Sequence, residues 1–327
     1  MKLTILTDIG LKLDLPEWKE ILSEFDVDIY HDTTPDLVVE RSEGAEILLT
    51  NKVVITPEHL KQLPEAKYII MASTGTNVVD LNYCHANNIW CSNVPAYSTN
   101  SVAQLVFSHI LNIYTRAEHY SQKNRKGAWS STTDFCYADS PIYELTDKTL
   151  GVVGLGAIGQ RVAKIAMAFG MNVVALSSKT TLPDSLLAVA DNTAGSIRVA
   201  KDKDDFYSSC DIITLHCPLS ENNAKMINAT SIEKMKEGVI IVNTARGGLI
   251  DEADMRKALD LGKVGAFAAD VISVEPAQKD NPIMDHPNAF ITPHNAWMSE
   301  EALYRLNITI INNIKNYLKT GEPINKV

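Results

Sequence analysis

The chain has 327 residues, which is enough for about two domains of ordinary size. Thirty basic against forty acidic side chains give a net charge of −10. Because an acidic surface repels phosphate backbones and anionic lipids, we expect no nucleic-acid partner and no membrane partner. Hydrophobic residues make up 45% of the chain and charged residues 21%, a balance that is typical of folded globular proteins and excludes wholesale disorder.

The five cysteines are odd in number and form no C-x-x-C pair, which predicts reduced, mostly buried thiols and a cytoplasmic location. The apolar run from Leu3 to Leu6 is too short for the core of a signal peptide, and no stretch approaches the length of a membrane helix. The histidines show no metal-ligand spacing, so we predict no metal site.

Short β-branched segments alternate with amphipathic ones, which predicts parallel sheets with helical crossovers. Near the N-terminus the predicted strands are Leu3–Thr7, Val27–Tyr30, Ile47–Thr50, Tyr68–Ala72 and Ile89–Ser92. The helices between them should begin near Pro16, Pro35, Pro57 and Asp80, because Pro and Asp suit a first helical turn.

The pattern changes at residue 100, where a long helix is predicted with Asn100 or Ser101 as its cap. A polar and aromatic stretch without a clear period follows, from Gly127 to Asp147. The next predicted strands are Thr149–Val153, Asn172–Leu176, Asp211–His216, Val239–Asn243, Gly265–Ala269 and Ala289–Thr292. A last helix, from Glu300 to Thr320, should end at Gly321. This order predicts two Rossmann-like or flavodoxin-like α/β domains with a cleft between them.

A glycine-rich turn, G-x-G-x-x-G, joins a predicted strand to a predicted helix. Gly154 would allow the tight turn, Gly156 would let the backbone approach a pyrophosphate, and Gly159 would let the helix pack closely on the strand. Ala157 and Ile158 open the helix, whose N-terminus offers unpaired N–H groups to phosphates. The pattern therefore predicts a dinucleotide site; the alternative is a structural turn in a cofactor-free fold.

Three chemically active side chains follow the ends of successive predicted strands: Arg246, Glu275 and His294. The carboxyl ends of parallel strands share one edge of the sheet, where the glycine turn also lies. Reduction of a carbonyl by a nicotinamide hydride needs a proton donor, and His can supply one near neutral pH. A carboxylate beside it would orient the ring, and a guanidinium can bind a substrate carboxylate at two points.

Together these segments resemble the D-isomer-specific 2-hydroxyacid dehydrogenase family, over nearly the whole chain. The residues that carry the resemblance are Ser73–Asp80, Asn93–Pro95, Ser101–Gln104, the glycine turn, His216–Leu219, Asn243–Gly247, Asp270–Pro276 and Pro293–His294. The resemblance implies that Arg246 binds the substrate, that Glu275 pairs with His294, and that His294 is the acid/base. Because the last helix returns after the final strand of the second domain, we expect residues 1–98 with 295–327 to form the substrate domain and 99–294 to form the dinucleotide-binding domain.

The resemblance further implies a backbone N–H loop for the substrate carboxylate, formed by Ser73, Thr74, Gly75 and Thr76. It implies a cofactor lining made by Thr74, Val102, His216, Cys217, Pro218, Thr244, Ala245, Arg246, Asp270 and His294. The segment from Trp129 to Tyr143 is similar to the family's dimer-forming arm, and a polar–aromatic segment of this length predicts a homodimer through the 100–147 region.

Within the family, the segments around Trp129 and Asp134–Tyr137, the pair Ala296-Trp297 and the ending Gly321–Asn325 look most like glycerate dehydrogenases, also called hydroxypyruvate reductases. The expected substrate is a small 2-keto acid, hydroxypyruvate or glyoxylate. A D-lactate-type reductase and a dinucleotide-responsive corepressor remain alternatives. The indole of Trp297 either contacts the substrate or packs under the last helix.

Cofactor preference rests on a departure from the usual NAD fingerprint, in which an acidic residue follows the glycines by about 20 positions. Position 177 is a serine here, followed by Ser178, Lys179 and Thr180. Two hydroxyls and an ammonium group could bind a 2′-phosphate that a carboxylate would repel. We therefore expect NADP to be favoured, with NAD as the alternative.

Overall fold

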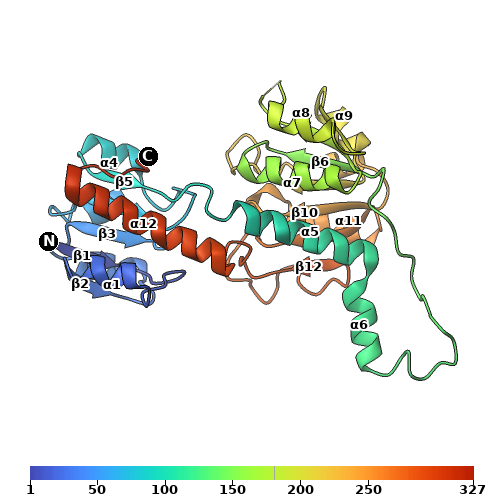
Figure 1. Cartoon of the computed structure of the whole chain (residues 1–327), viewed down its shortest axis with the longest axis horizontal. Coiled ribbons are helices and arrows are strands. Elements are labelled where there is room, and N and C mark those ends of the chain that lie inside the picture. The colour runs from blue at the N-terminus through green and yellow to red at the C-terminus, as the bar shows by residue number, and fades with distance from the viewer. Residues whose placement is uncertain (180) are drawn as a thin grey trace. The chain divides into compact units, whose positions relative to one another are not determined.

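Two parallel β-sheets organise the computed structural model, which describes residues 1–179 and 181–327. The five-stranded sheet has the order β2-β1-β3-β4-β5, and the seven-stranded sheet has the order β12-β11-β10-β9-β6-β7-β8. Each sheet belongs to one compact unit (Figure 1). Unit 1 comprises Met1–Ser98 and Trp297–Val327, and unit 2 comprises Thr99–Ala296. The predicted α/β class with two parallel sheets is confirmed.

Unit 1 follows the predicted alternation of strands and helices. Its strands are β1 (Lys2–Ile5), β2 (Asp26–Ile29), β3 (Ile47–Thr50), β4 (Tyr68–Met71) and β5 (Trp90–Ser92). Its helices are α1 (Pro16–Leu22), α2 (Val38–Arg41), α3 (Pro57–Leu60), α4 (Leu81–Ala86) and α12 (Glu300–Thr320), with a 3₁₀ turn at Pro35–Leu37. Asp80 caps α4 by accepting a hydrogen bond from the N–H of Tyr83 at 2.9 Å.

Helix α12 returns the end of the chain to unit 1 because its apolar stripe completes that unit's core. Leu303, Leu306, Ile310 and Ile314 pack with β-strand residues of unit 1 in one buried cluster. The helix ends at Gly321, whose φ of 81° lies in the left-handed region that favours glycine.

Unit 2 contains the seven-stranded sheet and the long helix that precedes it. Its strands are β6 (Thr149–Val153), β7 (Asn172–Leu176), β8 (Ser196–Val199), β9 (Ile212–Leu215), β10 (Val239–Asn243), β11 (Val264–Ala269) and β12 (Ala289–Ile291). Its helices are α5 (Thr99–Thr115), α6 (Ala117–Arg125), α7 (Ala157–Ala168), α8 (Asp184–Ala190), α9 (Lys203–Ser209), α10 (Ala229–Glu233) and α11 (Glu252–Asp260), with a 3₁₀ turn at Gly247–Leu249. Helices α5 and α7 pack together on one face of this sheet (Figure 1).

The structure corrects one feature of α5. The helix begins at Thr99, so Asn100 and Ser101 lie inside its first turn instead of capping it. The hydroxyl of Ser101 is used elsewhere, because it donates a 2.5 Å hydrogen bond to the carbonyl oxygen of Ala296.

The segment after α5 contains a further helix, α6, and then no helix or strand from residue 126 to residue 148. Arg116 separates α5 from α6 with a left-handed φ of 53°. Figure 1 shows α6 and the following segment, hereafter the arm (residues 127–147), extending away from the seven-stranded sheet of unit 2. In the part of the chain that the structure describes, no helix is both long enough and apolar enough to cross a membrane.

Candidate active site

The topology of unit 2 brings its candidate site residues to one edge of the sheet. All neighbouring strands of this sheet run parallel, so their carboxyl ends share that edge. The glycine turn follows β6, Ser177 follows β7, His216 follows β9, Arg246 follows β10, Glu275 follows β11 and His294 follows β12.

Of the three glycines in this turn, two are tightly packed against backbone atoms and one faces open space. A Cβ atom on Gly159 would lie 2.0 Å from the carbonyl oxygen of Gly154, so only glycine lets α7 approach the strand this closely. Gly154 has a φ of 92°, and its Cβ would lie 3.0 Å from the backbone of His216 and Cys217. A Cβ atom on Gly156, in contrast, would meet nothing within 4 Å.

Two further observations show that this edge fits a dinucleotide. Helix α7 begins at Ala157 without any side-chain cap, so its N–H groups remain available to an anion. The hydroxyl of Thr244, after β10, is buried and has no hydrogen-bond partner among the described residues. A buried polar atom left unpaired costs free energy, which a bound polar ligand relieves.

His294 and Glu275 form a pair. Nδ1 of His294 lies 2.6 Å from Oε2 of Glu275, and each side chain is about one-quarter to one-third exposed. The other carboxylate oxygen of Glu275 accepts a 3.2 Å hydrogen bond from the N–H of Ile272. The carboxylate is therefore held from both sides, and it fixes the orientation of the imidazole.

The backbone that carries His294 is held by Asp270. Oδ1 of this buried carboxylate accepts hydrogen bonds from Oγ1 of Thr292 at 2.6 Å and from the N–H of Asn295 at 3.0 Å, and Oδ2 accepts one from the N–H of Ala296 at 2.9 Å. These bonds stabilise an unusual conformation, because His294 has a φ of 52°. A non-glycine residue in the left-handed region costs about 1–3 kcal/mol and persists only where its surroundings fix it.

Arg246 follows β10 on a backbone that Asn243 holds. Asn243 is fully buried, donates to the carbonyl oxygen of Arg246 at 2.9 Å and accepts from the N–H of Ala245 at 3.0 Å. The next residue, Gly247, lies directly against the loop after β11, since a Cβ atom there would be 1.9 Å from the backbone of Ile272. The loops that carry Arg246 and Glu275 are thus in contact, while the guanidinium is exposed.

His216 is a neutral ring in this site. Burial lowers the pKa of His216 to about 3, because it disfavours the charged imidazolium. Its Nε2 lies 2.9 Å from the hydroxyl of Thr214. Burial also raises the pKa of the neighbouring Cys217 thiol, so that thiol stays protonated near neutral pH. Within residues 1–179 and 181–327, no three His, Cys, Asp or Glu side chains cluster as a metal site would require.

The predicted substrate loop lies in unit 1, directly after β4. Its carbonyl and hydroxyl groups are used within unit 1: Thr74 donates to the carbonyl oxygen of Val94 at 2.9 Å, and Asn93 donates to that of Thr74 at 2.8 Å. The N–H groups of Thr74, Gly75 and Thr76 donate to no acceptor in the described part of the chain. They are therefore available to an anionic ligand.

The remaining predicted residues lie in different surroundings. Ser177 accepts a 3.1 Å hydrogen bond from the N–H of Lys179, whose side chain is exposed together with Ser178. Thr180 lies outside the described residues. Val102 is buried in α5. Trp297 is only 9% exposed and packs in the core of unit 1, as one of its two sequence interpretations predicts.

Sequence reasoning missed the buried amides that support these loops. Asn51, which follows β3, donates to the carbonyl oxygen of Ala72 at 3.0 Å and steadies the start of the substrate loop. Its position directly after the apolar run Ile47–Thr50 is the one signal that could have singled it out.

Comparison with known proteins gives the class of the molecule. Residues 107–296 match the model of the D-isomer specific 2-hydroxyacid dehydrogenase, NAD binding domain. A hydroxypyruvate reductase from Blautia hydrogenotrophica is 36% identical over 330 residues, covering 100% of this chain and 99% of the relative. A glycerate dehydrogenase from Methylorubrum extorquens is 38% identical over 296 residues, covering 90% of this chain and 89% of the relative.

Two solved structures share the fold of this chain over nearly its whole length. An acyclic imino acid reductase in complex with NADPH and D-Arg is 28% identical with a TM-score of 0.85, and all of both chains is covered. A D-lactate dehydrogenase from Aquifex aeolicus, complexed with NAD and lactic acid, is 26% identical with a TM-score of 0.81 and 99% of each chain covered. The protein is thus an oxidoreductase that uses a nicotinamide cofactor. It belongs to the D-isomer specific 2-hydroxyacid dehydrogenase family.

Proposed function

We propose that this enzyme reduces a small 2-keto acid, hydroxypyruvate or glyoxylate, to D-glycerate or glycolate. The observation that carries the proposal is the His294–Glu275 pair at the sheet edge that also holds the glycine turn. The printed names of the two relatives at 36% and 38% identity support the substrate class.

Each residue of the proposed site has one task. The nicotinamide supplies the hydride when it is bound. His294 donates the proton to the oxygen of the carbonyl as it becomes an alkoxide, and Glu275 orients the imidazole. Arg246 binds the substrate carboxylate at two points and polarises the adjacent carbonyl. The proposed role of the N–H groups of Thr74 to Thr76, in unit 1, is to bind a substrate carboxylate.

Each unit has its own proposed task. Unit 1 is the proposed substrate domain, because it contains the Ser73–Thr76 loop; it resumes at Trp297, two residues later than the expected boundary at residue 295. Unit 2 is the proposed dinucleotide domain, and the family's NAD binding model covers residues 107–296. The proposed cofactor lining comprises the residues at the sheet edge of unit 2 described above and Val102 of α5, and Thr74 is a further proposed cofactor residue.

The test is a panel of 2-keto acids, assayed for turnover with NADH and with NADPH. Hydroxypyruvate and glyoxylate should give the highest kcat/KM, and Arg246→Lys should reduce it strongly because an ammonium group cannot make the bidentate contact. A preference for pyruvate would indicate a D-lactate-type reductase. Turnover only with an added amine would indicate an imino acid reductase. Nucleotide binding without turnover would indicate a corepressor-like binding protein.

We also propose that NADP is favoured over NAD. Ser177, Ser178 and Lys179 follow β7, where an acidic residue would otherwise accept hydrogen bonds from the ribose 2′-hydroxyl. Ser178 and Lys179 are exposed, which supports the proposal because their polar groups are accessible to a ligand. The main-chain N–H of Gly154 donates to the carbonyl oxygen of Leu176 at 2.9 Å, so the end of β7 lies directly beside the glycine turn.

We further propose that the protein is a homodimer through the 100–147 region. The arm presents large apolar side chains to solvent: Phe135 is 92% exposed, and Trp129, Ile142 and Tyr143 are each more than half exposed. Exposed apolar surface of this kind marks an interaction site. Sedimentation should give a dimer at micromolar concentration, and Phe135→Asp should shift it toward monomer; a wild-type monomer would refute the proposal.

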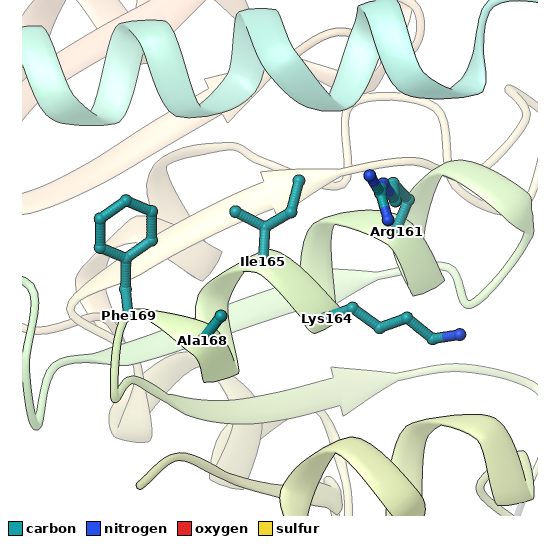
Figure 2. A pocket seen from close by; sticks show the side chains of 5 residues that line it. All are labelled: Arg161, Lys164, Ile165, Ala168 and Phe169. Atoms are coloured by element: carbon teal, nitrogen blue, oxygen red, sulfur yellow. The ribbon is translucent and has the colours of Figure 1, made fainter. Parts of the chain in front are cut away.

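A shallow groove lies along α7 of unit 2. Figure 2 shows Ile165 and Phe169 pointing from α7 toward α5, with Arg161 and Lys164 beside them. The groove has a volume of about 350 Å³, and the ring of Phe169 stacks on Phe107 of α5 at 5.6 Å.

The cysteines support a cytoplasmic location, which we propose as well. All five are free, and Cys84, Cys91 and Cys210 are buried. Reduced thiols are typical of the cytosol.

A further inference from the structure

Trp297 follows His294 by three positions and is the first residue of unit 1 after the chain leaves unit 2. Its indole lies against the backbone of Gly10, because a Cβ atom there would be 2.7 Å from Cζ3 of Trp297 and 3.5 Å from Cδ2 of Leu306. The ring of Tyr97 meets the indole edge to face, at 6.5 Å between centroids and 74° between planes. The indole is therefore enclosed by unit 1.

The surface that encloses the indole is itself rigid. Gly10 has a left-handed φ of 82°, and its carbonyl oxygen accepts a 2.9 Å hydrogen bond from the amide of Asn307. The fully buried Asn307 also accepts from the N–H of Lys12 at 2.9 Å and from Nε1 of Trp18 at 2.6 Å. The loop after β1 thus has a fixed position against which the indole rests.

Only two residues separate Trp297 from His294, and both are held in unit 2. Asp270 accepts hydrogen bonds from the N–H groups of Asn295 and Ala296, and Ser101 donates to the carbonyl oxygen of Ala296 at 2.5 Å. A displacement of the indole therefore has few torsions in which to relax before it reaches the left-handed backbone of His294.

We propose that Trp297 is a positioning residue for His294, acting through the backbone of residues 294–297 and without touching the substrate. Gly10 contributes to the same positioning, because any side chain there would displace the indole. The inference rests on the proposed acid/base role of His294. It differs from a purely stabilising role for the indole, which would leave proton transfer unchanged in the folded enzyme.

The test compares Trp297→Ala and Gly10→Ala with two matched controls. Ile310→Ala truncates another fully buried residue of the same apolar cluster. Gly44→Ala places a side chain at a φ of 70° in unit 1, where no atom lies within 4 Å. For each variant we would measure Tm, kcat and KM with hydroxypyruvate and with glyoxylate, the solvent deuterium isotope effect on kcat, and the affinity for NADPH.

Trp297→Ala and Gly10→Ala should lower kcat by about tenfold or more, by a similar factor for both keto acids, since small misplacements of a catalytic group cost this much. The solvent isotope effect should increase because proton transfer becomes slower, while the affinity for NADPH stays within about twofold. Trp297→Phe, which keeps an aromatic ring, should restore most of kcat. Ile310→Ala and Gly44→Ala should lower Tm alone.

An unchanged kcat in Trp297→Ala, or an equal loss in Ile310→Ala, would overturn the proposal. A loss confined to one keto acid and expressed mainly in KM would also overturn it, since it would indicate direct substrate contact. A second measurement, which needs no turnover, uses the proton NMR signal of the His294 imidazole, assigned by its loss in His294→Gln. This signal should shift or broaden in Trp297→Ala and stay in place in Ile310→Ala. If the wild-type enzyme turns over no keto acid, the proposed function is refuted, while the NMR measurement still decides the role of Trp297.

Discussion

Nδ1 of His294 lies 2.6 Å from Oε2 of Glu275, although the two residues follow different strands of the sheet, β12 and β11. With Nδ1 engaged by the carboxylate, the proposed acid/base role of His294 assigns proton exchange with the substrate to Nε2.

Replacement of His294 by Gln should reduce kcat by about 10²–10⁴, which is the usual effect of losing a positioned acid. The steady-state turnover of hydroxypyruvate measures this loss of kcat. His31→Gln is the matched control, because His31 also pairs with a carboxylate, Asp8, at 2.8 Å, but on an exposed part of unit 1. A His294→Gln enzyme with near wild-type kcat would remove His294 from the mechanism.

Gly156→Ala should leave folding intact and weaken cofactor binding about tenfold or more. An added Cβ meets no protein atom within 4 Å, so it occupies the open side where the pyrophosphate is expected to approach the backbone. Thermal unfolding and NADPH titration measure the two effects. Gly159→Ala should instead lower Tm sharply, because its Cβ would lie 2.0 Å from a carbonyl oxygen. Unchanged NADPH affinity in Gly156→Ala would contradict the placement of the phosphates.

His216 should make the stability of the ligand-free protein depend on pH. Its folded pKa of about 3 lies below the unfolded value of about 6.5, so its contribution is complete above pH 6.5 and is lost as the pH falls toward 3. By pH 5 the loss should be roughly 1–2 kcal/mol. The unfolding free energy of His216→Gln should therefore fall less between pH 7 and pH 5 than that of wild type. Equal slopes would show that the ring is not buried in its neutral form.

Ser177→Asp should shift cofactor use from NADPH toward NADH. A carboxylate at the end of β7 would repel a 2′-phosphate and accept hydrogen bonds from a 2′-hydroxyl, changing the kcat/KM ratio by about tenfold or more. Ser177→Asn, of similar size but uncharged, separates charge from bulk. If wild type prefers NADH and Ser177→Asp changes nothing, the strand end does not select the cofactor.

The local rules of parallel sheets predicted most of the candidate site. Arg246, Glu275 and His294 were found because each follows a predicted strand, and parallel strands end at one edge. The edge strand β8 was missed because Ser196–Val199 is only four residues long and none of them is fully buried. Helix α6 was missed because none of its residues is buried, so it has no apolar stripe to detect.

Long-range partnerships could not be predicted from the sequence. The contact between Gly10 and Trp297 joins opposite ends of the chain. The hydrogen bonds from the N–H groups of Asn295 and Ala296 to Asp270 depend on the left-handed backbone conformation of His294. Ser101 is of a residue type that often caps helices, yet its hydroxyl donates to the carbonyl oxygen of Ala296 instead. Periodicity and propensity describe one segment at a time, and these features arise only when segments meet.

The most direct test of the account is the product formed from hydroxypyruvate and NADPH that carries deuterium on the transferred position of the nicotinamide. Chiral chromatography with mass detection should show D-glycerate with one deuterium on C2, formed by wild type and reduced by about a hundredfold or more in His294→Gln. L-glycerate, a product without deuterium, or equal yields from the two enzymes would contradict a D-specific hydride transfer completed by His294.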